Sequence, residues 1–306
     1  MKVNIRKAGV LYCDRCDLPI VDKANHVHKN TFNYHITCSA SPTKDSVNQI
    51  ILGDCLTVMR GFDDACIDLT VTSPPYDNLR TYGGYSFDFE PIARELYRVT
   101  KDGGVAVWVV GDQTKNGSES GTSFKQALYF KEMGFNLHDT MIYQKKAIFN
   151  YDPRNMRCKQ SFEYMFVFSK GKPITYNEIK DVPVVKRGMV ASGEHGRTPD
   201  GMKRSGNTFT HQDFQARSNI WAYATGNNLS TKDKVAFQHP AIFPEQLAHD
   251  HIISWSNEGD TILDPFNGSG TTTKIAKKLN RNYIGIEINP EYVKIAQDRL
   301  KQEVLL

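Results

Sequence analysis

Long apolar runs are missing from this sequence. The longest is Val-Ala-Val-Trp-Val-Val at residues 105–110, far short of the roughly 20 apolar residues that a membrane-spanning helix needs. The first residues also lack the apolar stretch that a secretory signal peptide carries. We therefore predict a cytoplasmic protein with no membrane partner.

Cysteine is scarce as well, and the two signs of charge nearly balance. Six cysteines in 306 residues are too few for a disulfide-stapled scaffold of this length. The net charge of +4 identifies no partner by itself. Its distribution is more informative, because residues 171–235 hold ten lysines and arginines against six acidic residues. That segment alone accounts for the excess of positive charge.

Half of the cysteines fall within the first 38 residues, close to histidines. Two close pairs about twenty residues apart can surround one tetrahedral Zn²⁺ and leave no position open for catalysis. The predicted ligands of this structural zinc are Cys13, Cys16, His35 and Cys38. His26 and His28 are either competing ligands or exposed loop residues. The spacing is similar to that of LIM and related zinc-knuckle modules, so residues 1–45 are predicted to form a small zinc module.

Beyond this module, strand-like and helical patterns alternate. Apolar runs predict strands at 48–52, 67–71, 104–110, 137–143 and 163–169, and helical spacing predicts helices at 91–99 and 123–133. Such alternation is typical of an α/β layered fold. Regular patterns resume near residue 239, whereas the intervening segment has little apolar periodicity. We predict two catalytic halves, 46–170 and 236–306, separated by an irregular insertion at 171–235.

One predicted strand runs directly into Ser73-Pro74-Pro75-Tyr76. Pro74 must end the strand because proline cannot donate to a β-ladder, and Pro75 restricts Pro74 to an extended backbone. The Pro74 carbonyl thereby points in a fixed direction beside the Ser73 hydroxyl. Two such acceptors can hold both hydrogens of a planar NH2 group and favour a nucleophilic nitrogen, while Tyr76 can stack on an extruded base. The alternative is an ordinary loop.

A second motif follows the strand that ends at Asp264. Gly268 and Gly270 lie in the turn that opens the next helix, where a missing Cβ lets backbone approach a ligand. Glu287 closes the following strand nineteen residues after Gly268, a spacing that suits an acid binding the ribose hydroxyls of a nucleoside cofactor. The third glycine of a dinucleotide motif is missing, and Asp264 would repel a diphosphate. These features favour S-adenosylmethionine, which carries an amine and a sulfonium; a tight strand-to-helix turn is the alternative.

With both motifs in this order, the chain resembles the amino-group DNA methyltransferases of the permuted (β) class, in which Ser-Pro-Pro-Tyr precedes Phe-x-Gly-x-Gly. The resemblance covers about residues 48–169 and 236–303. It implies a Rossmann-like α/β fold with a mostly parallel seven-stranded sheet and helices on both faces. It also implies methyl transfer from S-adenosylmethionine to the exocyclic amino group of a flipped base in double-stranded DNA.

The resemblance further implies residue roles. The positions that hold the target base are Ser73, Pro74, Pro75 and Tyr76. The positions that bind S-adenosylmethionine are Asp54, Asp264, Phe266, Gly268, Ser269, Gly270, Thr271 and Glu287. Asp54 matches an acid near the adenine amino group. The insertion matches the region that reads the DNA sequence, in keeping with its positive charge, and a solvated flexible loop is the alternative.

Several functional alternatives stay open at this point. Serine at position 73 resembles the cytosine-N4 enzymes, whereas adenine-N6 enzymes more often carry aspartate or asparagine there, so N4-cytosine is favoured over N6-adenine. A methyltransferase of the same fold that acts on RNA or on a protein amide is a second reading, and a non-catalytic zinc-dependent DNA-binding protein is a third. The sequence leaves open the recognition sequence, a cognate enzyme in a restriction-modification system, and whether the protein is a monomer or a homodimer.

Overall fold

The computed structural model describes residues 26–29, 32–35, 46–75, 87–146, 154, 156–192, 199–202, 208–226 and 229–302. The predicted zinc module falls almost entirely outside these ranges, as do Cys13, Cys16, Cys38 and Tyr76. His35 ends β2 (Phe32–His35), which pairs with β1 (His26–Lys29). Within the described ranges, no helix is long and apolar enough to cross a membrane.

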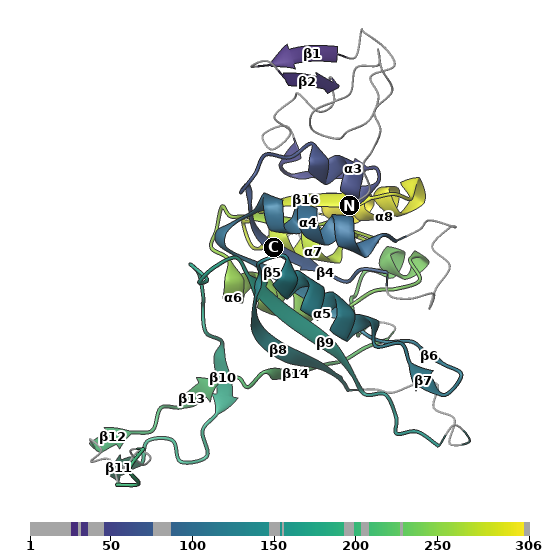
Figure 1. Cartoon of the computed structure of the whole chain (residues 1–306). Coiled ribbons are helices and arrows are strands. Elements are labelled where there is room, and N and C mark those ends of the chain that lie inside the picture. Colours follow the sequence, from purple (N-terminus) through teal and green to yellow (C-terminus); the bar gives the residue numbers. More distant parts are fainter. Residues whose placement is uncertain are drawn as a thin grey trace.

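A single eight-stranded sheet forms the centre of the molecule (Figure 1). Its strands are β3 (Gln49–Leu52), β4 (Ile67–Thr72), β5 (Thr100–Val110), β8 (Asn136–Lys145), β9 (Phe162–Ser169), β14 (Ile220–Tyr223), β15 (Thr261–Asp264) and β16 (Asn282–Glu287). They lie side by side in the order β14-β8-β9-β5-β4-β15-β16-β3. In this sheet β9 runs antiparallel to both neighbours, and the remaining pairs are parallel. The predicted mostly parallel α/β sheet is thus confirmed.

The prediction of seven strands was wrong by one. The additional edge strand, β14, pairs in parallel with β8 and lies inside the segment expected to be irregular. Its burial alternates, with Trp221 and Tyr223 packed inward and Ile220 exposed, as a strand on the edge of a core requires. Four residues among polar neighbours give too short a pattern to stand out in the sequence.

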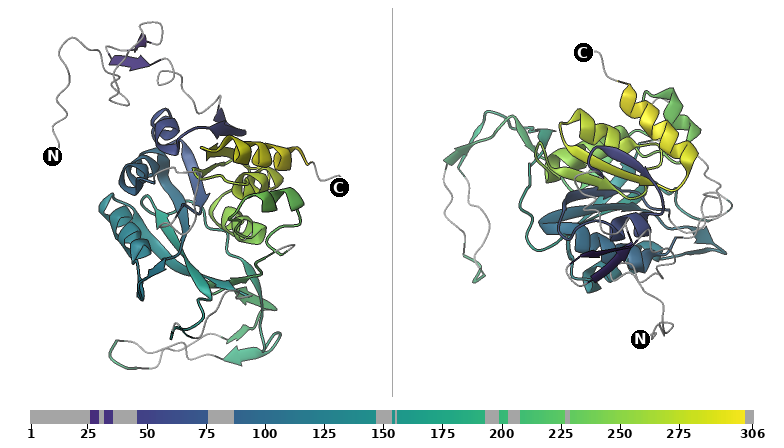
Figure 2. Two further views of the ribbon diagram at one scale, coloured as in Figure 1. Left: turned by 90° about the vertical axis from the view of Figure 1, so that its right-hand side faces the viewer. Right: turned by 90° about the horizontal axis from the view of Figure 1, so that it is seen from above.

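Both faces of the sheet are covered by helices, because its central strands are apolar on both sides. In β5, Ala106, Trp108 and Val110 face one core, while the residues between them face the other. The first core is closed by α3 (Cys55–Arg60), α4 (Phe89–Val99) and α5 (Thr122–Glu132). The opposite face carries α6 (Glu245–Trp255), α7 (Thr271–Lys278) and α8 (Pro290–Lys301). Figure 2 shows the resulting three layers.

The two ends of the catalytic region meet at one edge of the sheet. Leu52 of β3 stands opposite Glu287 of β16, and the Gly53 amide donates to the Glu287 carbonyl at 2.9 Å. The permuted halves therefore rebuild one continuous sheet. Because the parallel strands share a direction, their carboxyl ends gather along one rim, which is where α/β folds bind ligands.

The insertion forms a narrow two-stranded ribbon that projects from the body (Figures 1 and 2). It contains the antiparallel pairs β10 (Lys180–Pro183) with β13 (Phe214–Ala216), and β11 (Val190–Ser192) with β12 (Thr208–Thr210). At its base Arg217 forms ion pairs with Asp181 in β10 and with Asp250 in α6, the latter at 2.5 Å. The remaining elements are β6 (Thr114–Lys115), β7 (Ser118–Glu119) and the 3-10 helix η3 (Lys234–Gln238).

Candidate active site

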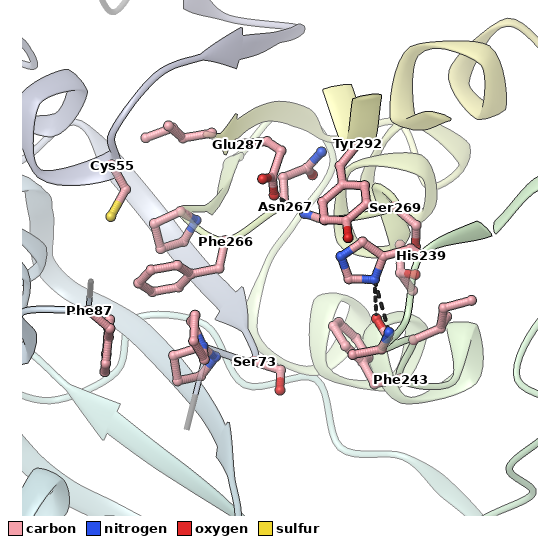
Figure 3. A pocket seen from close by; sticks show the side chains of 18 of the residues that line it. Cys55, Ser73, Phe87, His239, Phe243, Phe266, Asn267, Ser269, Glu287 and Tyr292 are labelled. Atoms are coloured by element: carbon pink, nitrogen blue, oxygen red, sulfur yellow. Dashed lines mark hydrogen bonds between the residues drawn. The ribbon is translucent and has the colours of Figure 1, made fainter. Parts of the chain in front are cut away.

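A cavity of about 830 Å³ runs along the carboxyl rim of the sheet. Its walls come from the ends of β3, β4, β15 and β16 at one side and from β5, β8 and β9 at the other. A ligand pocket typically measures roughly 300–1,000 Å³, so the space suits a nucleoside-sized molecule together with a base. Figure 3 shows Ser73, Phe266 and Glu287 around this single space.

The structure brings the two sequence motifs together. Ser73, Pro74 and Pro75 line the cavity directly after β4 ends. Thr72, the last residue of β4, donates from Oγ1 to Asp264 Oδ1 at 2.6 Å. The same carboxylate oxygen accepts the Phe266 amide at 3.1 Å. One buried acid therefore ties the Ser-Pro-Pro turn to the glycine turn.

Asp264 itself does not line the cavity. Its side chain is 1% exposed, and burial raises its pKa to about 6, against hydrogen bonds that lower it. Its neighbour in sequence, Phe266, does reach the cavity and packs edge-on against Phe87, with ring centroids 5.5 Å apart. Asp264 thus connects β4 to β15 while Phe266 forms an apolar wall.

Gly268 and Glu287 form the floor of the cavity at the glycine turn. The Gly268 amide donates to Glu287 Oε2 at 2.8 Å, and the Asn289 amide donates to Oε1 at 2.9 Å. Burial raises the pKa of Glu287, partly offset by these amides. Gly268 has φ of +48°, and a Cβ there would come within 2.9 Å of His239 Nε2. Only glycine fits between the histidine and the cavity.

The remaining loop residues are held from behind by a buried arginine. Arg299 of α8 is fully buried and donates to the Ser269 carbonyl at 2.7 Å, to Ser269 Oγ at 3.1 Å and to Thr271 Oγ1 at 3.3 Å. Its charge is met by Asp233 and Glu245 at 3.2 and 2.6 Å. Ser269 and Thr271 line the cavity with their orientations fixed by this network.

Gly270 and Asp54, the last two residues predicted to bind the cofactor, differ in whether they reach the cavity. Gly270 does not line the cavity; a Cβ there would lie 2.8 Å from Ala296 Cβ, so its glycine allows α7 to pack on α8. Asp54 does line the cavity, as the N-cap of α3, and its Oδ1 accepts from the Thr57 amide at 2.8 Å. Asp54 follows the edge strand β3, so the glycine turn after β15 lies between it and Ser73.

Several lining residues carry no signal in the sequence. His239 and Tyr292 pack edge-on with ring centroids 4.3 Å apart and close the cavity near the glycine turn. At the opposite end, Lys145 and Glu163 face the cavity as an ion pair. None of these belongs to a local motif, because each reaches the rim from a different element. Only long-range contacts, between β8 and β9 and between η3 and α8, bring each pair together.

The sheet, the cavity at its carboxyl rim and the meeting of the glycine turn with the Ser-Pro-Pro turn are the features expected of a methyltransferase that uses a nucleoside cofactor. A family model described as DNA methylase, N6/N4, matches residues 67–298. The chain is 58% identical over 249 residues to the orphan methyltransferase M.BamHII of Bacillus amyloliquefaciens, covering 79% of this chain and 92% of that protein. The chain belongs to the N6/N4 amino-group DNA methyltransferase family, whose reaction depends on S-adenosylmethionine.

More distantly related DNA methyltransferases also match this chain. Identity to the type II methyltransferase M.SmaI of Serratia marcescens is 27% over 295 residues, covering 82% of this chain and 90% of that one. Among solved structures, a DNA modification methylase of Thermus thermophilus in complex with S-adenosyl-L-methionine aligns with a TM-score of 0.58 at 25% identity, covering 84% of this chain and 94% of that one. The cytosine-N4-specific PvuII DNA methyltransferase shares the fold, with a TM-score of 0.60 at 20% identity, covering 84% and 87%.

Proposed function

We propose that this enzyme methylates the exocyclic N4 amino group of cytosine in double-stranded DNA. The observation that carries the proposal is the shared cavity, in which Ser73 and Pro74 stand one strand away from the Gly268 turn. Serine at the first motif position, as in the cytosine-N4 enzymes, supports cytosine over adenine. N6-adenine is the alternative within the same family.

The residues on the cofactor side suit S-adenosylmethionine. Glu287 offers a carboxylate for the ribose hydroxyls, Asp54 offers one near the adenine amino group, and Ser269 and Thr271 offer hydroxyls to the methionine end. The missing Cβ at Gly268 lets its backbone lie against His239, which also lines the cavity. When bound, the cofactor supplies an electrophilic methyl group on its sulfonium.

The protein's own contribution is to place and polarise the amine. The Ser73 hydroxyl and the Pro74 carbonyl accept the two amino hydrogens, and Tyr76 stacks on the base. Asp264 acts as a positioning residue, since its bridge from Thr72 to Phe266 fixes the distance between the two turns. Fixed acceptors need no reorganisation during the transfer, which is how preorganised sites lower a barrier.

We also assign the insertion at 171–235 to reading the DNA sequence. Its projecting ribbon carries the exposed side chains of Lys180, Lys186 and Arg187. A two-stranded β-ribbon is narrow enough to enter the major groove.

The N-terminal zinc site remains a proposal based on the spacing of Cys13, Cys16, His35 and Cys38. Elemental analysis of the purified protein should find one equivalent of zinc, lost in Cys13→Ser. A metal-free protein with full activity would contradict it.

The experiment that tests the main proposal identifies the modified base. DNA is incubated with the enzyme and labelled S-adenosylmethionine, digested to nucleosides and analysed by mass. N4-methyldeoxycytidine is the expected product. N6-methyldeoxyadenosine would overturn the base assignment and leave the family intact.

A further inference from the structure

The end of the cavity away from the glycine turn holds an ion pair that the chemistry above does not use. Lys145 Nζ lies 2.6 Å from Glu163 Oε1, and the two side chains are 26% and 15% exposed. Both residues line the same cavity as Ser73. The pair is therefore neither a surface contact nor part of the core, and it faces the space where a base would enter.

The sheet register explains why the pair stands there. Lys145 is the last residue of β8, and Tyr143 lies two residues before it on the same face. Tyr143 is directly opposite Glu163 in the β8–β9 ladder. Burial, and after it the Glu163 carboxylate, raises the pKa of Tyr143, which keeps its phenol neutral. The three side chains form one polar wall of the cavity.

The distance from this wall to Ser73 suits a base. In the strand order, β9 is two places and β8 three places from β4. Neighbouring strands lie about 4.8 Å apart, and the ladder puts Lys145 about four residues further along the strands than Ser73, so their backbones are separated by on the order of 20 Å. The Ser73 side chain, a pyrimidine ring and an extended lysine side chain together reach across this span. A base whose amino group is held at Ser73 turns its next ring edge toward Lys145.

That edge differs between the two candidate bases. Beside its amino group cytosine presents N3 and the carbonyl O2, which are both acceptors, whereas adenine presents N1 and then a C–H. An ammonium has three N–H donors, so Lys145 keeps donors for a second partner while paired with Glu163.

We propose that Lys145, oriented by Glu163, donates a hydrogen bond to O2 of the extruded cytosine and so selects cytosine over adenine. This inference rests on the proposed function, because it assumes that an amino-bearing base occupies the Ser73 end. It adds a base-recognition residue that neither sequence motif contains.

The test combines a protein variant with a base analogue at the mapped methylation site. In one duplex the target is cytosine; in the other it is a 2-aminopyridine C-nucleoside, which keeps the amino group and ring nitrogen but has C–H where cytosine has O2. Lys145→Met is compared with the wild type, and Lys146→Met is the matched control, since Lys146 is exposed and does not line this cavity. Values of kcat/KM are measured for each combination.

The wild type and Lys146→Met are expected to lose about ten- to hundredfold in kcat/KM on the analogue, the usual effect of losing a hydrogen bond to a charged group. Lys145→Met should lose a similar factor on cytosine and then treat both duplexes alike. Equal sensitivity of Lys145→Met and the wild type to the analogue would overturn the inference.

Folding and base assignment are controlled separately. Unchanged affinity for S-adenosylmethionine shows that Lys145→Met is folded, and Lys145→Leu, which also lacks a donor, replaces it in the same comparison if it is not. A wild type that methylates adenine alone overturns the N4 assignment and this inference together. Transfer to cytosine with an unchanged analogue effect in the variant rejects the role of Lys145 and leaves the proposed function standing.

Discussion

Gly268 and Gly270 are two residues apart and need glycine for different reasons. Both have positive φ, at +48° and +80°, where a side chain is strained. A Cβ on Gly268 would collide with His239 at the edge of the cavity, whereas a Cβ on Gly270 would collide with Ala296 on α8. Glycine at the first position therefore keeps the cavity lining free of a clash with His239, and glycine at the second allows α7 to pack on α8.

Gly268→Val is expected to abolish binding of S-adenosylmethionine, because the added side chain occupies the approach to the turn. The affinity is measured by isothermal titration calorimetry. Gly259→Val is the matched control: its φ is also positive, at +85°, but a Cβ there meets nothing within 4 Å. Both variants should lose about 1–2 kcal/mol of stability from backbone strain. Equal cofactor affinity in the two variants would show that Gly268 does not face the cofactor.

Ser73→Ala tests the other turn. Loss of one acceptor for the amino hydrogens should lower kcat about ten- to hundredfold, while the affinity for S-adenosylmethionine stays unchanged because Ser73 does not touch the glycine turn. Single-turnover methyl transfer to DNA measures the chemical step. Ser118→Ala in the exposed β7 hairpin serves as control. An unchanged rate in Ser73→Ala would remove the hydroxyl from the reaction.

At the scale of elements, α6 shows how a helix can carry a pH-sensitive group far from the active site. His251 is fully buried, with Nε2 3.2 Å from Met165 Sδ and its ring 4.8 Å from that of Trp221. Burial lowers its pKa to about 3, against an opposing effect of Asp250. In the unfolded chain the same imidazole titrates near its usual pKa of about 6.5.

The difference between the two pKa values of His251 makes the stability of the protein depend on pH. Below pH about 6.5 His251 binds a proton in the unfolded state but not in the folded state. The free energy of unfolding therefore falls as the pH is lowered toward 3. Between pH 7 and pH 5 this group alone costs about 2 kcal/mol of unfolding free energy. His251→Leu removes the group, so the variant should lose correspondingly less stability on acidification. Urea titrations at the two pH values measure the difference; parallel losses in wild type and variant would contradict it.

The elements that the sequence predicts well are those marked by local chemistry. Pro74 ends β4 as expected, and α8 begins after Asn289, whose side chain accepts the Glu291 amide at 2.9 Å. What escapes prediction depends on contacts between distant segments. Arg299 is an example: arginine is mostly exposed in folded proteins, yet Asp233 and Glu245 neutralise this one in the core behind the glycine turn.

The candidate site divides in the same way. The Ser-Pro-Pro turn and the glycine turn are recognisable because each requires special backbone conformations within a few residues. The Lys145–Glu163 pair arises from the pairing of β8 with β9, and the His239–Tyr292 contact from the packing of η3 against α8, and no local pattern encodes either. The sequence singles out Asp264 at the end of its strand, but the contact of its carboxylate with Thr72 is visible only in three dimensions.

For the whole molecule, the ribbon that we propose reads DNA is separate from the cavity that holds the two turns. The catalytic rim lies on the body, while the exposed ribbon projects from it and is tied to α6 at its base by Arg217. The net positive charge of the chain is concentrated in this insertion. DNA affinity should therefore depend on ribbon charges that have no effect on the cofactor.

This separation predicts a specific salt dependence. Binding through phosphates releases counterions, so log Kd should change linearly with log salt, with a slope that falls by about 1 for each lost phosphate contact. Replacing Lys180, Lys186 and Arg187 with glutamine should reduce the slope by up to about 3 and leave cofactor affinity unchanged. Fluorescence anisotropy from 50 to 200 mM salt, roughly the range over which such slopes are resolved, measures it. The control variant replaces Lys277, Lys294 and Lys301 on α7 and α8 with glutamine and should keep the wild-type slope. An equal reduction of the slope in both triple variants would mean that DNA binding depends only on total charge and that the ribbon has no special role.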